Sequence, residues 1–324
     1  MTSDRPVQTG HSWTLATRLL TLNAKRMRVQ MTIATVGLLV FLACQREKPA
    51  DPAYLRDWSE WHAERVAELK APDGWLALVG LYWLKEGPNT FGSAPGNDVL
   101  FPVVAPGKMG SFVLEGDSVR MEVLPGTNVH EKDSSTVVRE AVLKLADGVS
   151  PVVYSWGSLD WVLLERGGKY GIRLWDRNSV NIAKMDSIPH YPLDLGWKLE
   201  ATLIPADSGR TVRMQNVLGM TMEQASAGTL EFQIEGKTFQ LEALEEPGGY
   251  FLIFADETSG EETYSGGRYL SAPKADTGGK TVIDFNKAYN PPCAFTKYAT
   301  CLLPPAGNRL PLAIRAGERD YGHH

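Results

Sequence analysis

The densest group of side chains that could bind or react lies near the C-terminus, in residues 281–318. Polar groups in this segment alternate with Pro292, Pro304 and Pro305, a pattern typical of a rigid loop that presents side chains rather than of a regular helix or strand. We therefore predict contacts to a small polar ligand from Asp284, Asn286, Tyr289, Asn290, Asn308 and Arg309. The same residue types also cap turns and satisfy backbone groups, so a structural network, with Arg309 buried against Asp284 or Glu318, is the competing interpretation.

A second polar loop, residues 255–269, lies between two apolar runs of the sequence. Its side chains predict further ligand contacts, for which we single out Asp256, Thr258, Tyr264 and Arg268. Arg268 would hold an anionic carboxylate or phosphate in a bidentate fork. We expect this loop to meet residues 284–290 on one ligand-facing surface, because each follows an apolar run that a sheet would hold rigid. Alternatively, residues 255–269 form a solvated hairpin loop.

Acid–base catalysis is a third chemistry that these residues permit. Asp284 and Glu318 would act as an acid–base pair if the fold brings them together, and Asp256, Arg268 and the 290–301 loop would complete a hydrolase site. His62, His130 and His190 are separated in the sequence and are interpreted as isolated packing or surface residues. No familiar catalytic or nucleotide-binding motif occurs in a suitable context, and the sequence indicates no cofactor and no metal site.

Two cysteines lie within this C-terminal region, Cys293 and Cys301. An even pair in an oxidising compartment predicts a disulfide. A metal pair, a nucleophilic thiol or two free thiols are the alternatives; no histidine lies nearby in the sequence to complete a zinc site, and no local base is visible.

The segment TVIDFNKAYNPPCAFTKYATCLLPPAGNRLPLAIRAGE, together with Asp256, Thr258, Tyr264 and Arg268, resembles the pattern of the bacterial family DUF1684, whose activity is not established. The resemblance runs from Tyr54 to Glu318, with its specificity beyond Phe251. The resemblance favours a functional role for Asp256, Thr258, Tyr264 and Arg268, and it implies no particular reaction.

The N-terminus predicts export. Lys25, Arg26 and Arg28 precede an uncharged run from Met31 to Ala43, which is too short to span a bilayer and is typical of a signal peptide. Cys44 follows directly and resembles the lipidated cysteine of a lipobox, with Phe41 where leucine is usual. We expect a signal over residues 1–43, from an over-extended start, and a lipid anchor at Cys44 that holds the protein to the outer membrane, facing the periplasm.

Charge supports a membrane anchor made of acyl chains rather than of basic residues. Five cationic side chains against Asp4 give residues 1–43 a net charge of +4, so the remainder of a chain with net charge −5 carries −9. An acidic body argues against nucleic acid or anionic lipid as a partner.

Apolar periodicity predicts the elements that must position these loops. After a polar tether at residues 44–53, the spacing of Leu55, Trp58, Trp61, Val66 and Leu69 predicts an amphipathic helix over 54–72. Short runs rich in Val, Leu, Phe, Tyr and Trp then alternate with turn residues, which indicates a mainly β protein. We expect one antiparallel β unit over 73–179 and a second β sandwich or barrel-like unit over 180–324.

The first β unit carries a resemblance of its own. Residues Thr90 to Val99, TFGSAPGNDV, look like the strand and loop of forkhead-associated (FHA-like) sandwiches. Ser93 stands where those domains carry the arginine that holds phosphothreonine, so the resemblance implies the sandwich shape and not phosphopeptide binding.

Three functions follow from these observations. The first is a lipid-anchored envelope protein that binds a small polar or anionic ligand or an envelope component. The second is a hydrolase acting on an envelope substrate, and the third is a structural partner of an envelope complex. The sequence identifies no particular protein partner.

Overall fold

The computed structural model describes Met1, residues 51–145 and residues 152–322. The expected signal over 1–43, the lipid site at Cys44, most of the tether over 44–53 and the terminal His323–His324 pair lie outside these residues. Residues 50–324 form one compact unit. None of the helices in the described ranges combines the length and the apolar character needed to cross a bilayer.

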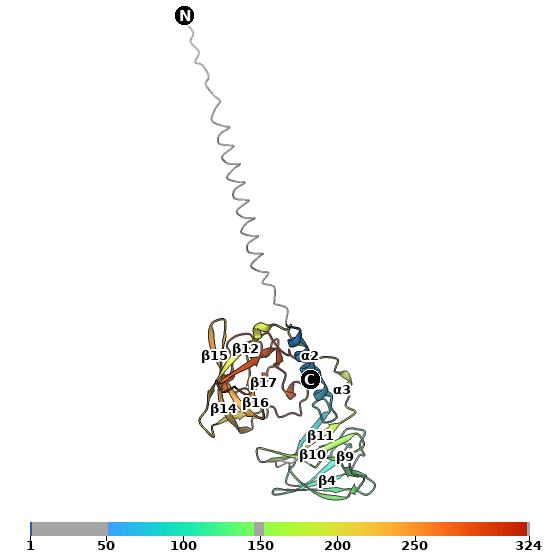
Figure 1. The fold of residues 1–324 in the computed structure, drawn as a ribbon. Helices are drawn as coiled ribbons and strands as arrows, with labels where there is room; N and C mark the ends of the chain where they lie inside the picture. The colour runs from blue at the N-terminus through green and yellow to red at the C-terminus, as the bar shows by residue number, and fades with distance from the viewer. Residues whose placement is uncertain (2–50, 146–151, 323–324) are drawn as a thin grey trace. The chain divides into compact units, whose positions relative to one another are not determined.

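The fold is mainly β, as predicted, with one long helix at its start (Figure 1). The helices are α2 (Pro52–Lys70) and the short α3 (Val180–Lys184). The strands of the first half are β1 (Leu78–Trp83), β2 (Gly87–Gly92), β3 (Val99–Leu100), β4 (Gly110–Glu115), β5 (Ser118–Val123), β6 (Val129–Glu131), β7 (Val137–Val138), β8 (Glu140–Leu143), β9 (Tyr154–Trp156), β10 (Leu159–Arg166) and β11 (Lys169–Asp176). Those of the second half are β12 (Lys198–Pro205), β13 (Thr211–Gln215), β14 (Thr221–Ile234), β15 (Lys237–Glu246), β16 (Gly249–Phe254), β17 (Arg268–Pro273) and β18 (Lys280–Asp284).

Helix α2 begins two residues earlier than predicted and ends two residues earlier. Asp51 caps it, because its carboxylate accepts a hydrogen bond from the N–H of Ala53 at 3.0 Å, and Pro52 occupies the first turn, where its missing N–H costs nothing. The buried face carries Tyr54, Arg65 and Leu69, whereas Leu55, which the pattern places inside, is 40% exposed.

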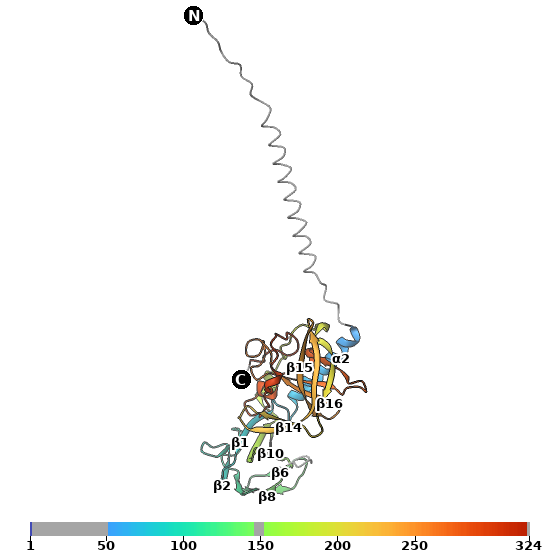
Figure 2. The same cartoon turned by 90° about the vertical axis from the view of Figure 1, so that its left-hand side faces the viewer.

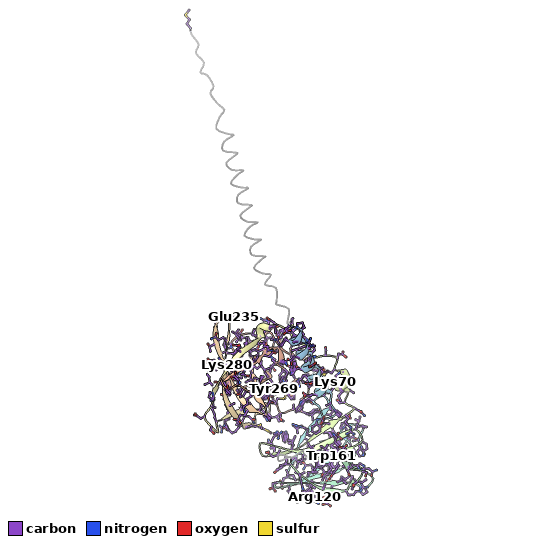
Figure 3. The ribbon with its side chains drawn as sticks, viewed as in Figure 1. Lys70, Arg120, Trp161, Glu235, Tyr269 and Lys280 are labelled. Carbon is purple, nitrogen blue, oxygen red and sulfur yellow. The ribbon has the colours of Figure 1, made fainter. Side chains whose placement is uncertain are left out.

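The first β unit is a sandwich of two sheets. One sheet has the order β1-β11-β10-β9-β6-β7 and the other has the order β3-β2-β4-β5-β8, with every pair antiparallel except β2 and β3 (Figure 2). Side chains from both sheets, among them Phe91, Phe112 and Trp161, form one core between them. Figure 3 labels Trp161 among the side chains of this unit. Burial of such large apolar groups is the main stabilising contribution in a domain of this kind.

The second β unit is a single, nearly closed sheet. Its order is β17-β16-β15-β14-β12-β18, with β13 paired to β14, and the end strands β17 and β18 contact one another. Leu230, Phe254, Leu270 and Ile283 fill its interior. Beyond β18 the chain makes only short 3-10 turns, η2 (Phe285–Lys287), η3 (Pro292–Ala294) and η4 (Ala306–Asn308), which confirms the expectation of an irregular segment rather than a regular element.

Candidate functional site

Arg268 is a buried structural residue. It begins β17, is 1% exposed, and its Nη2 donates to Oδ2 of Asp256 at 2.6 Å and to the Ile314 carbonyl at 2.9 Å. Its Nη1 donates to the carbonyls of Ala316 and Glu318. With both terminal nitrogens bound by the protein, the guanidinium has no fork free for an anion in this structure.

Asp256 and Thr258 fix the loop that precedes β17. Oδ1 of Asp256 accepts from the backbone N–H of Thr258 at 2.7 Å and from the Thr258 hydroxyl, which lies 2.9 Å from the hydroxyl of Thr263. Both predicted ligand residues are buried. The Asp256 carboxylate thus accepts hydrogen bonds from its own loop and from Arg268, contacts that stabilise the loop conformation.

The three predicted asparagines are also buried and hold backbone groups. Asn286 bonds the carbonyl and the N–H of Asp194, and Asn308 does the same for Glu242. The side-chain amide of Asn290 donates to the carbonyl of residue 319 at 2.7 Å. These amides bridge segments that are distant in the sequence, although Oδ1 of Asn290 has no hydrogen-bond partner among the described residues.

Tyr264 and Arg309 also lie outside the groove described below. Tyr264 is half-buried at the edge of two apolar clusters, and burial raises the pKa of its phenol to about 12. Arg309 is exposed and follows η4. The alternative that Arg309 is buried against Asp284 or Glu318 is wrong.

Arg65 takes the place expected for Arg309. It projects from α2, is 9% exposed, and its Nε lies 3.3 Å from Oε1 of Glu318. Its Nη2 donates to the Asn290 carbonyl at 2.8 Å, and its guanidinium carbon lies 4.7 Å from the centroid of the Tyr289 ring. One feature of the sequence could have indicated this role: Arg65 is a charged residue on the apolar face of α2, next to Val66 and one turn before Leu69.

Glu318 is held at the centre of this cluster. Its Oε2 accepts from the N–H of Asn290 at 2.7 Å. Burial raises the pKa of Glu318, while Arg65 and the Asn290 N–H act in the opposite direction. Gly317 makes the position possible: its φ is +80°, and a Cβ there would lie 2.4 Å from the Ala288 carbonyl oxygen.

Beside this cluster, α2 and the β16–β17 hairpin enclose two adjoining cavities of about 410 and 600 Å³, which we call the α2 groove. The two cavities share Trp61, Glu246, Ser271 and Tyr289. Of the ten predicted ligand residues, Asp284 and Tyr289 line the groove. The structure adds Trp61, Glu64, Glu68, Trp75, Glu246 and Phe251, which the sequence did not single out as ligand contacts.

Aromatic faces and hydrogen-bonding groups meet at the middle of the groove. The Ser271 hydroxyl donates to Glu246 at 3.0 Å, and the rings of Tyr269 and Tyr289 are 6.0 Å apart in a T-shaped arrangement. Burial raises the pKa of Tyr289 to about 12, against the influence of Arg65. The Tyr289 phenol therefore stays protonated at neutral pH and is available as a hydrogen-bond donor or acceptor.

The groove is acidic. Glu64, Glu68 and Glu246 line the first cavity with Arg65, whose charge Glu318 already balances. In the second cavity Lys287 is paired with Asp57 at 2.7 Å, and Lys198 lines the cavity with Asp284 and Glu246. A hollow of this size with aromatic walls and a few polar groups has the character of a small-molecule site, and its charge favours a neutral or cationic ligand over an anion.

The expected acid–base pair does not form. Asp284 accepts hydrogen bonds from the Tyr54 hydroxyl at 3.1 and 3.0 Å and caps η2, while Glu318 is engaged by Arg65. The residues proposed for a hydrolase are thus committed to separate structural contacts. In the described ranges no three or more His, Cys, Asp or Glu side chains cluster as metal ligands would.

Two of the histidines interpreted as isolated are neighbours. The His62 and His190 rings lie 5.7 Å apart, and Trp58 stacks on His62 at 4.9 Å. Burial, His190 and Arg65 lower the pKa of His62. This cluster helps to pack α2 against the segment around His190.

Cys293 and Cys301 are free, buried thiols in the structure, so the predicted disulfide is not formed there. The two residues are in direct contact: the N–H of Cys293 donates to Sγ of Cys301 at 3.0 Å, and the N–H of Cys301 donates to Sγ of Cys293 at 3.4 Å. Their thiols interact, which lowers the pKa of Cys293 and raises that of Cys301.

We expect these thiols to oxidise to a disulfide when the protein is exported to an oxidising compartment. The bridge would close a short loop and stabilise the fold by about 2–3 kcal/mol. Thiol titration of unfolded, unreduced protein from the cell envelope should find neither cysteine reactive, while protein made in a reducing cytosol should show both. Two reactive thiols in the exported protein would refute the bridge.

Comparison with known proteins supports the resemblance to DUF1684. Residues 183–319 match the family described as "Protein of unknown function (DUF1684)", a shorter range than the expected Tyr54 to Glu318. A solution NMR structure of an uncharacterized protein of Haloarcula marismortui is 29% identical over 44% of this chain and 82% of its own, with a TM-score of 0.38. No curated protein matches the chain.

Proposed function

We propose that the protein is a lipid-anchored binding protein of the cell envelope, whose α2 groove takes a small polar ligand with a ring that stacks on aromatic side chains. The observation that carries the proposal is the convergence of Trp61, Tyr289 and Ser271 with Glu246, where the two cavities join. The FHA-like character of the sandwich remains a proposal about shape. It carries no phosphopeptide site, since Ser93 donates to the Ala105 carbonyl.

The charge of the groove narrows the ligand class. Three carboxylates face the first cavity beside an arginine that is already paired. An anionic ligand, which the Arg268 fork had suggested, would meet like charge here. A neutral or amino-substituted sugar of the envelope suits both the aromatic faces and the carboxylates.

Three derivatives of glucose, one cationic, one neutral and one anionic, test the binding proposal. We expect glucosamine and N-acetylglucosamine to bind better than glucuronate in calorimetric or NMR titrations. Trp61→Ala should weaken binding about two- to tenfold through loss of ring stacking. Glu246→Gln should reduce the preference for glucosamine, whereas Glu245→Gln, its exposed neighbour on β15, serves as the matched control. Equal binding of all three sugars, or equal effects of both glutamines, would contradict the assignment.

The anchor has its own test. Cys44→Ser should move the protein from the membrane to the soluble fraction, because acyl chains at that cysteine supply the membrane affinity. The intact mass of membrane-extracted wild type should show an acylated N-terminus at Cys44. Membrane association that survives Cys44→Ser would refute lipid anchoring without bearing on the groove.

A further inference from the structure

A third cavity, separate from the α2 groove, lies between α3 and residues 321–322. Its volume is about 720 Å³, larger than either cavity of the groove. Four stretches of chain form its walls: residues 76–79 at the start of β1, α3, residues 295–298, and the C-terminal residues 321–322.

The inner wall of this cavity is apolar. Leu76 and Leu78 are each 1% exposed, and the rings of Phe295 and Tyr321 lie 4.9 Å apart. Thr296 is also buried, and its hydroxyl already donates to the Leu78 carbonyl at 3.3 Å. These buried groups form the base of the cavity, and the half-buried Val79 and Tyr298 give an occupant accessible apolar surface.

The charge of the lining has one sign. Lys184 and Lys297 are exposed, and among the residues that the structure describes no carboxylate lines the cavity with them. Neither lysine forms an ion pair among the described residues. The Lys297 ammonium group makes a cation–π contact, with Nζ 5.3 Å from the centroid of the Tyr298 ring. In a chain of net charge −5, two unpaired ammonium groups beside an apolar hollow are complementary to an anion that carries an apolar body.

We propose that this cavity binds a single-chain amphipathic carboxylate, such as a free fatty acid. The alkyl chain packs on Val79 and Tyr298, the half-buried apolar side chains of the lining. The carboxylate lies between the ammonium groups of Lys184 and Lys297. A wall of this kind selects by chain length, because each methylene that it buries contributes roughly the same free energy. The ligand class differs from that of the α2 groove, and the proposal is independent of the groove's function.

Calorimetric titration with octanoate, decanoate and dodecanoate below their micelle concentrations tests the proposal on the full mature protein. We expect one molecule to bind per chain and affinity to rise about fourfold per added methylene until the cavity is filled. Dodecanol, with the same chain and no charge, should bind about tenfold more weakly. Equal affinity for dodecanol, or no dependence on chain length, would overturn the assignment.

Paired variants locate the site. Lys184→Glu with Lys297→Glu should reduce dodecanoate affinity at least tenfold, while Lys169→Glu with Lys237→Glu, the same charge change at exposed positions outside the cavity, should not. Asn181→Trp, an exposed position in the lining, should block the cavity without touching the apolar wall. Equal losses in both lysine pairs would show attraction by surface charge alone, and unchanged binding in Asn181→Trp would place the ligand elsewhere; either result refutes the site.

Discussion

Arg268→Met is expected to lower the free energy of unfolding by about 3–5 kcal/mol, because it leaves a buried carboxylate without its partner. The Arg268–Asp256 ion pair is 2.6 Å long, with side chains 1% and 0% exposed. The substitution also leaves the carbonyls of Ile314 and Ala316 without the donor they have in the wild type. Each unsatisfied buried group adds to the loss. Urea unfolding followed by circular dichroism measures the change.

Arg315→Met is the matched control for this experiment. Arg315 pairs with Glu262 at 2.9 Å, but its side chain is 61% exposed. Solvent screens such a pair, so the same substitution should change stability far less. If Arg268→Met unfolds no more easily than Arg315→Met and instead loses ligand affinity, then Arg268 serves ligand binding after all and the structural role assigned to it is wrong.

The fold was predictable from local patterns because those patterns act over short distances. The 3.6-residue spacing from Trp58 to Leu69 indicates α2, and the alternation of β-branched or aromatic runs with turn residues indicates the strands. The predicted start of the helix at Tyr54 was two residues late, because Asp51 is a good N-cap residue and Pro52 suits the first turn. The prediction that Leu55 is buried was wrong because the neighbouring Tyr54 lies on the buried face of the helix, where its hydroxyl donates to Asp284.

The site was less predictable because the same residue types serve ligands and scaffolds. Nothing in the sequence distinguishes the carboxylate of Asp256, which holds its own loop, from that of Glu246, which faces a cavity. Burial decides between them, and burial depends on contacts between distant segments. Arg65 and Glu318 are 253 positions apart, so no local pattern predicts that they pair.

Arg65 joins α2 to the C-terminal loops through several contacts. Its guanidinium pairs with Glu318, donates to the Asn290 carbonyl and lies over the rings of Tyr289 and Phe295 at 4.7 and 5.5 Å. We expect Arg65→Leu to cost about 3–5 kcal/mol of stability at neutral pH. Because α2 forms one wall of the groove, amide hydrogen exchange should accelerate in α2 before it does in the β strands.

The loss of stability caused by Arg65→Leu should depend on pH, because the substitution changes the pKa of Glu318. Burial raises the pKa of Glu318 in the folded protein above its ordinary value of 4.5, and Arg65 opposes that shift. Without Arg65 the folded-state pKa rises further, so the folded variant keeps a proton that the unfolded chain releases. A raised folded-state pKa gives stability that is complete below pH 4.5 and is lost as pH rises through the folded value. The gap between wild type and variant should therefore be small near pH 4.5 and full at pH 8.

Arg56→Leu is the control for that pH series. Arg56 is exposed on the same helix, and its substitution by leucine removes the same charge as Arg65→Leu. Its stability should follow the wild type at every pH. A gap for Arg65→Leu that stays constant from acid to alkaline pH would show that Glu318 does not sense Arg65. Arg65 would then stabilise α2 only by packing on Tyr289 and Phe295, and an apolar side chain of similar volume could replace it.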